Sequence, residues 1–221
     1  MAKNLFRPAR VIVLTLAATL LTTGCSYVRS RYGEQCNSRA YLNSSLADFI
    51  NSRFHSNSQV RMAVIPFSTE ANLSPRGSEF PGLGDQLAWK VHAELLQAEA
   101  MPIIEVFNRQ DWPGKKEEFF TGNFGALSMA REAGYDLVLV GLVERQKGIQ
   151  SMSAFTKVMD VDSGITVWYG KTTASSNQRT MDRVEDFFWL KDRDPSELYL
   201  DELIGKTAKC IVKAATAEPE V

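Results

Sequence analysis

A continuous apolar run, YDLVLVGLVE at Tyr135–Glu144, limits the folds open to this chain more than any other feature. A strand with one buried face alternates apolar and polar residues, whereas a run without alternation is typical of a strand covered on both faces. Two further strand-like segments follow, Ser153–Val161 and Ile165–Ala174, and the tripeptide DSG at 162–164 predicts a tight turn between them. The run and the hairpin together predict a sheet with helices packed on its faces.

Apolar residues at helical or strand spacing account for most of the remaining chain. In chain order we expect a helix over Leu42–Phe54, a strand over Val60–Phe67, a helix over Leu83–Gln97, a strand over Ile103–Phe107, a helix over Gly125–Gly134 and one or two helices over Ser196–Thr216. The predicted order is therefore α-β-α-β-α-β-β-β-α. It indicates an α/β (α+β) fold, in which helices pack on a mixed sheet of about five strands.

The N-terminal segment has the pattern of a lipoprotein signal peptide. An apolar run from Val11 to Leu21 follows Lys3, Arg7 and Arg10, and it is shorter than the roughly 20 residues of a membrane-spanning helix. The run ends in LTTGC, which resembles a bacterial lipobox, so we expect Cys25 to become the first mature residue and to carry acyl chains. More than one chain makes such an anchor durable, at about 0.8 kcal/mol for each buried methylene. An ordinary cleaved signal with an incidental cysteine is the alternative.

The residue after the lipidated cysteine indicates the membrane. Ser26 is not the aspartate that retains lipoproteins in the inner membrane, so we expect outer-membrane anchoring with the protein facing the periplasm. The expected parts are a signal peptide (1–24), a lipidated linker (25–40), a single periplasmic α/β domain (41–216) and a frayed tail (217–221).

The charge balance argues against a nucleic-acid partner. The chain has 25 Lys and Arg against 26 Asp and Glu, and its first 24 residues include three basic and no acidic residues. The remainder, with 22 basic and 26 acidic residues, has a net charge near −4. Nucleic-acid-binding surfaces need an excess of Lys and Arg, so we expect no nucleic-acid partner.

The cysteine count becomes informative once the compartment is inferred. The chain has three cysteines, and if Cys25 is lipidated, Cys36 and Cys210 remain as an even pair in an oxidising space. We therefore predict a disulfide that joins the N-terminal segment to the C-terminal helix. Closing so long a loop stabilises the fold by about 4–5 kcal/mol in the entropic model, although measured values are often lower. Two buried thiols are the alternative.

Four segments between about residues 60 and 175 resemble a group of periplasmic lipoproteins. They are RMAVIPF at 61–67, LGDQLAWKVHAEL at 83–95, GYDLVLVGLVE at 134–144 and VMDVDSGITVWYGK at 158–171. The group includes CsgG, PelC, FlgO and LpoB, and its members share a small α/β domain that is also seen at the N-terminus of TolB. The resemblance implies a CsgG/TolB-N-terminal-like fold.

The resemblance also implies a non-catalytic role as an assembly or accessory component of a cell-envelope export or biogenesis machine. Its implied partners are envelope proteins and outer-membrane lipid, the latter through Cys25, and a homo-oligomeric ring is an implied form of assembly. CsgG builds a membrane barrel from extra amphipathic hairpins. Here the segments 113–123 and 175–197 are too polar and too short for that task. A channel formed by this chain alone is therefore disfavoured.

Motifs for catalysis or metal binding are missing from the sequence. Counted from Asp160, the segment DVDSG has Ile165 and Lys171 at the EF-hand positions that require glycine and glutamate. His55 and His92 are the only histidines and fall on separate predicted helices. We therefore expect no metal, no cofactor and no enzymatic activity. The alternative is a lipid-anchored hydrolase of envelope glycans that uses an Asp/Glu pair, because sequence does not give the distance between carboxylates.

Clusters of aromatic residues outside the predicted core indicate contact surfaces. Aromatic side chains are enriched in protein interfaces, so we name seven of them as candidate partner-binding residues. They are Trp112, Phe119, Phe120, Phe124, Phe187, Phe188 and Trp189. The alternative is that they cover the sheet as additional core.

Overall fold

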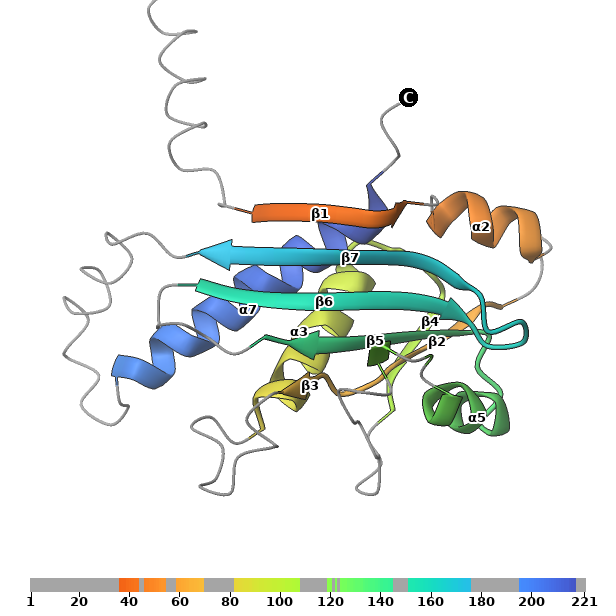
Figure 1. Ribbon diagram of the computed structural model, residues 1–221, viewed down its shortest axis with the longest axis horizontal. Coiled ribbons are helices and arrows are strands. Elements are labelled where there is room, and N and C mark those ends of the chain that lie inside the picture. The colour runs from red at the N-terminus through yellow and green to blue at the C-terminus, as the bar shows by residue number, and fades with distance from the viewer. Residues whose placement is uncertain are drawn as a thin grey trace, which may run out of the picture. The chain divides into compact units, whose positions relative to one another are not determined.

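One mixed sheet organises the part of the chain that the computed structural model describes, residues 36–43, 46–54, 59–69, 82–107, 119–120, 122, 124–144, 151–175 and 195–217 (Figure 1). Its strands are β1 (Cys36–Asn43), β2 (Arg61–Val64), β3 (Ser68–Thr69), β4 (Ile103–Val106), β5 (Leu137–Val143), β6 (Ser151–Asp160) and β7 (Thr166–Ser175). They lie in the order β1-β7-β6-β5-β2-β4, and β3 also pairs with β5. The pairs β1–β7, β7–β6 and β6–β5 are antiparallel. The pairs β5–β2, β2–β4 and β3–β5 are parallel.

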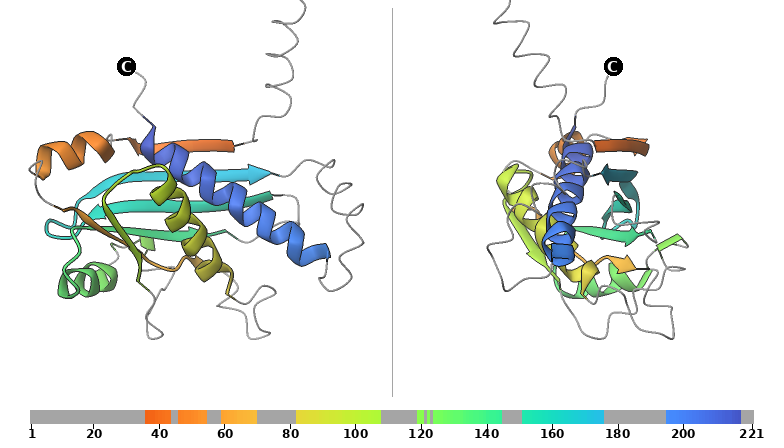
Figure 2. Two further views of the ribbon diagram at one scale, coloured as in Figure 1. Left: turned by 180° about the vertical axis from the view of Figure 1, so that it is seen from behind. Right: turned by 90° about the vertical axis from the view of Figure 1, so that its left-hand side faces the viewer.

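Helices are distributed unequally over the two faces of this sheet. They are α2 (Leu46–Arg53), α3 (Leu83–Gln97), α5 (Phe124–Glu132) and α7 (Pro195–Thr216). α3 and α7 pack side by side on one face, where α7 contacts β1, β7 and β6 and α3 contacts β2, β3 and β4 (Figure 2). α5 packs on the opposite face against β5, which leaves most of β6, β7 and β1 on that face without a described helix. None of the described helices is both long and apolar enough to span a bilayer.

The apolar run forms β5, a strand that is covered on both faces, as predicted. All seven residues of β5 are buried. Leu137 and Leu139 belong to the core under α3 and α7, whereas Val138 and Val140 belong to the core under α5. Because both faces are covered, the strand has no polar side chain, and burying each of its leucine and valine side chains is worth about 1.5–3 kcal/mol.

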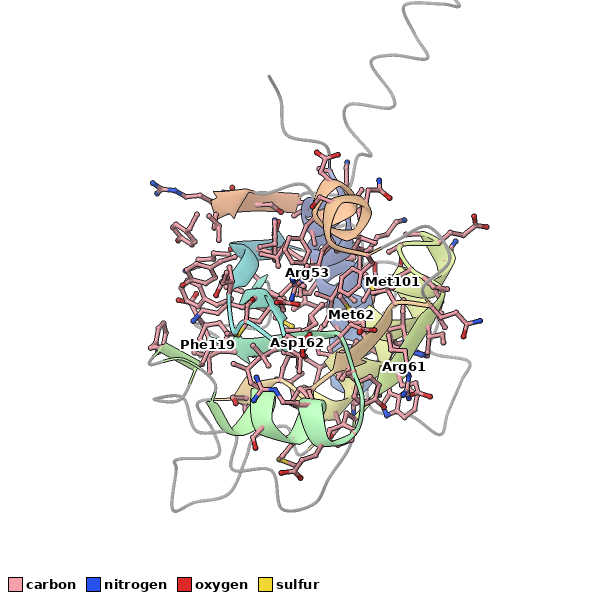
Figure 3. The ribbon with its side chains drawn as sticks, turned by 90° about the vertical axis from the view of Figure 1, so that its right-hand side faces the viewer. Arg53, Arg61, Met62, Met101, Phe119 and Asp162 are labelled. Atoms are coloured by element: carbon pink, nitrogen blue, oxygen red, sulfur yellow. A yellow bond between two sulfur atoms is a disulfide. The ribbon has the colours of Figure 1, made fainter. Side chains whose placement is uncertain are left out.

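The predicted hairpin joins β6 to β7. Gly164 in its turn has a φ of 71°, a left-handed conformation that glycine adopts without strain. Asp160 is 2% exposed and accepts hydrogen bonds from the backbone N–H and the hydroxyl of Ser163. Arg53 of α2 lies 3.7 Å from the Asp160 carboxylate and 3.8 Å from that of Asp162 (Figure 3). The turn is therefore fixed both locally and by a separate helix.

Two parts of the sheet differ from the sequence prediction. The sequence predicts a linker up to residue 40 and a helix from Leu42, whereas residues 36–43 form β1 and α2 begins at Leu46. Half of the residues of β1 are polar, and its pairing with β7 comes from long-range backbone hydrogen bonds that local periodicity does not reveal. The predicted strand Val60–Phe67 ends at Val64 before Pro66, which has no N–H to donate, and β3 follows. The sheet therefore has seven strands rather than about five.

A disulfide joins the first strand to the last helix. Cys36 at the start of β1 and Cys210 in α7 form the bond, with their Cα atoms 5.6 Å apart and 174 residues apart in sequence. The Cys210 side chain lies in the core between α7 and the sheet. The bond therefore ties the edge strand β1 to the helical layer.

Candidate functional site

The face of the sheet opposite α7 carries aromatic and basic side chains on neighbouring strands. We call this surface the aromatic–basic face. Its residues come from β1, β6, β7 and the segment 119–120: they are Arg39, Tyr41, Phe120, Phe155, Lys157, Tyr169 and Lys171. Residues two apart in a strand share one face, so each strand contributes an aromatic residue and a cation to this surface.

Strand register aligns two cations in a row across the sheet. Phe155 of β6 is opposite Lys171 of β7, and Lys171 is opposite Arg39 of β1. Like charges that face each other across strands are destabilising unless an anion is close. Glu144 lies 2.6 Å from Lys171 and neutralises that end of the row. Arg39 lies over the ring of Tyr41, 5.5 Å from its centre, and no carboxylate in the described ranges forms an ion pair with it.

The second row is mainly aromatic. Lys157 is opposite Tyr169, and the ring of Tyr41 lies 5.1 Å from the ring of Tyr169 between centroids. Phe155 lies 6.3 Å from Tyr169, and Phe120 lies 6.2 Å from Phe155. Rings at such distances attract one another by about 0.5–1.5 kcal/mol beyond area burial. Tyr41 and Phe120 remain 48% and 52% exposed, so apolar ring surface is available to a partner.

Lys157 is a partly buried cation at the centre of this surface. Its Nζ lies 4.5 Å from the ring centre of Phe119 and 5.3 Å from that of Tyr169, and it donates a hydrogen bond to the carbonyl oxygen of Phe119. Aromatic rings attract a cation by about 0.5–2 kcal/mol but do not replace its hydration. Burial accordingly lowers the pKa of Lys157.

Replacing Lys157 with methionine is expected to change how stability depends on pH. The pKa of this lysine in the folded protein lies below the ordinary value of 10.5, so the unfolded chain binds more protons in the alkaline range beneath that value. The free energy of unfolding of the wild type should therefore rise as the pH approaches 10.5, relative to Lys157→Met. Urea unfolding of both proteins from neutral pH upward checks this. A difference that does not change with pH contradicts the burial of the ammonium.

Among the seven aromatic residues predicted from sequence as partner-binding candidates, the structure describes Phe119, Phe120 and part of Phe124. Phe120 is exposed and belongs to the aromatic–basic face. Phe119 is 2% exposed, and its ring contacts Tyr169 of β7 and the Lys157 ammonium of β6, so its burial supports the core alternative (Figure 3). Phe124 begins α5, and its side chain is outside the described part of the chain. The remaining predicted residues, Cys25, Trp112, Phe187, Phe188 and Trp189, also lie outside the described residues.

Most of the aromatic–basic face is missing from the sequence prediction. A signal for it exists in the hairpin, where the pattern aromatic-x-Lys occurs at 155–157 and again at 169–171. Alternation places each pair on one face, and the DSG turn brings the two pairs together. The contribution of β1 could not be inferred, because its pairing with β7 was not predicted.

Two described groups that could suit catalysis or metal binding, Glu105 and His92, have structural partners. Glu105 accepts a hydrogen bond of 2.6 Å from the Tyr135 hydroxyl and lies 3.2 Å from Arg61. The hydrogen bond from Tyr135 is the main cause that lowers the pKa of Glu105, whereas a glycosidase general acid needs a raised pKa. His92 Nε2 lies 3.0 Å from the carbonyl oxygen of Ile104. Within the described ranges, no group of three or more His, Cys, Asp or Glu could hold a metal.

Comparison with solved structures finds similar folds at low sequence identity. The PelC dodecamer from Paraburkholderia phytofirmans is 16% identical, with 80% of this chain and 97% of that chain covered and a TM-score of 0.46. Lipoprotein GNA1162 from Neisseria meningitidis is 15% identical, with coverage of 60% and 95% and a TM-score of 0.40. The LpoB C-terminal domain from Salmonella enterica is 13% identical, with coverage of 60% and 93% and a TM-score of 0.31. PelC and LpoB are members of the group that the sequence resembles.

No family model matches the chain, and no curated protein matches it.

Proposed function

We propose that this protein is a lipid-anchored accessory component of a cell-envelope export or biogenesis machine. Cys25 holds it on the periplasmic side of the outer membrane, and the α/β domain makes or breaks no covalent bond in a substrate. Its role is to bind an envelope protein partner through the aromatic–basic face. Assembly of several copies into a closed ring, on other surfaces, is compatible with this role.

The disulfide between Cys36 and Cys210 is the main observation that supports a location in the periplasm. Disulfides persist in oxidising compartments such as the periplasm and are rare in the cytosol. Of the three cysteines, the bond uses two and leaves Cys25 at the end of the apolar N-terminal segment. That is the position in which a bacterial lipobox places the acylated residue. The cysteine pattern thus supports export and lipid attachment together.

The aromatic–basic face supports binding rather than chemistry. Tyrosine and arginine are among the residues most enriched at the energetic centres of protein interfaces, and phenylalanine is enriched in interfaces generally. Tyr41 and Phe120 expose about half of their surface, next to three cations and one described carboxylate, Glu144. An exposed surface of this composition is complementary to an acidic partner that also offers apolar groups.

Growth of the producing bacterium with an alkyne analogue of palmitate tests the anchor. The wild-type chain should incorporate the label and fractionate with the outer membrane, whereas Cys25→Ser should lose the label and be released or remain unprocessed. Cys36→Ser is a matched control, because it removes another cysteine and leaves the lipobox intact. Equal labelling of wild type and Cys25→Ser, or wild-type protein found free in the cytosol, would refute the proposed anchor.

A further inference from the structure

The outer edge of β1 has no strand beside it in the described part of the chain. β1 is eight residues long, and among the described strands it pairs with β7 alone. Every residue from Asn37 to Leu42 is exposed, and two large apolar side chains, Tyr41 and Leu42, are 48% and 41% exposed. An open edge strand offers backbone N–H and C=O groups for pairing with another chain. A bulge near Tyr41 interrupts the register and leaves the segment from Cys36 to Ala40 regular.

This edge also has a cation, Arg39, without an anionic partner among the described residues. Arg39 ends the row that begins with Phe155 and continues through Lys171. Glu144 pairs with Lys171, but Arg39 has no ion-pair partner among the described carboxylates. The next position along the row lies beyond β1, where an added strand would place a side chain opposite Arg39. A carboxylate at that position would make a favourable cross-strand pair in place of the like-charge contact.

We infer that an extended acidic segment of a partner protein adds to the outer edge of β1 as a further strand of the sheet. Backbone hydrogen bonds along β1 supply the register, as in other cases of strand addition. Alternate side chains of the segment lie on the aromatic–basic face, where a carboxylate meets Arg39. The inference rests on the proposed function, because it takes the partner to be an envelope protein.

Two other occupants fit the edge less well. A second copy of β1 offers the segment CNSRAYLN, which contains an arginine and no acidic residue, so self-pairing supplies no carboxylate for Arg39. An anionic polysaccharide could meet the cations but has no regular row of amide donors and carbonyl acceptors to match the strand edge. Only an acidic peptide satisfies both the backbone and the charges.

A synthetic peptide tests the inference on the full-length protein in detergent micelles. The peptide has alternating glutamate and threonine and the length of β1, eight residues. Two comparison peptides have alternate backbone nitrogens methylated, one on each edge, and a third has lysine in place of glutamate. Fluorescence anisotropy of labelled peptides gives the dissociation constants. We expect the acidic peptide to bind at least about tenfold more tightly than the lysine peptide and than at least one methylated form.

Charge reversal on the protein locates the binding site. Arg39→Glu is expected to raise the dissociation constant of the acidic peptide by about tenfold, since it removes one attraction and adds a repulsion. Lys213→Glu is the matched control: it makes the same change of net charge at an exposed position of α7, the helix that covers the other face, and should change binding less than about twofold. Thermal unfolding of both variants confirms that they fold.

Several results would overturn the inference. Equal binding of the acidic peptide and both methylated forms would show that the backbone edge is not used. Equal weakening by Arg39→Glu and Lys213→Glu would show a general charge effect. Binding of a galacturonate hexasaccharide as tight as that of the peptide would indicate an anionic glycan site, and self-association lost in Arg39→Glu would indicate a second copy. These outcomes leave the palmitate test of the anchor unaffected, and failure of that test leaves the peptide result unaffected.

Discussion

Reduction of the bond between Cys36 and Cys210 is expected to lower the free energy of unfolding by about 2–5 kcal/mol. The bond closes a loop with a sequence separation of 174, so it removes many conformations from the unfolded chain. It also holds the start of β1 against α7, and β1 is an exposed edge strand with few apolar contacts of its own. Loss of the bond should therefore release β1 before the rest of the sheet unfolds.

Two measurements separate these effects. Urea unfolding with and without a reductant gives the change in free energy, and hydrogen exchange shows whether the amides of β1 lose protection first. The double variant Cys36→Ser with Cys210→Ser should match the reduced wild type and should not respond to the reductant. A wild type that unfolds at the same urea concentration in both conditions would contradict the structural role of the bond.

Trp168→Ala is expected to destabilise the fold by about 3–5 kcal/mol. Trp168 is 1% exposed and lies in the core between β7 and the layer of α3 and α7. Its ring covers Gly170, where a Cβ atom would come within 2.8 Å of the indole. Truncation to alanine removes the whole ring and leaves a cavity. The neighbouring Gly170 has no side chain that could move in to fill it.

Trp89→Ala is the matched control for that substitution. Trp89 is 54% exposed on α3 and makes an edge contact with the ring of His92. Its removal should change the free energy of unfolding by no more than about 0.5 kcal/mol. Trp168→Phe should cost about 1 kcal/mol, because it keeps most of the ring and removes an indole N–H with no hydrogen-bond partner among the described groups. Equal losses from Trp168→Ala and Trp89→Ala would contradict the packing.

Some elements could be predicted because their signals are local. The residues of β5 are apolar at every position since both faces are covered, and the DSG turn at 162–164 fixes the hairpin that follows. The stripe at Leu83–Gln97 likewise predicts α3 with the observed bounds. Strand β1 could not be predicted in this way, because its residues show no apolar alternation and its conformation depends on β7, more than 120 residues away in sequence.

The candidate site shows the same division. The sequence determined which strands carry aromatic-x-Lys pairs, and it singled out Cys36 and Cys210 by counting cysteines in an inferred compartment. Only the tertiary structure decided that α5 packs mainly against β5 among the described strands of its face, that Arg39 lies opposite Lys171 and that Phe119 is buried while Phe120 is not. The physical reason is the sequence distance over which each interaction acts. Alternation and turn chemistry act between near neighbours, whereas strand order, register and the coverage of a face result from contacts between distant segments.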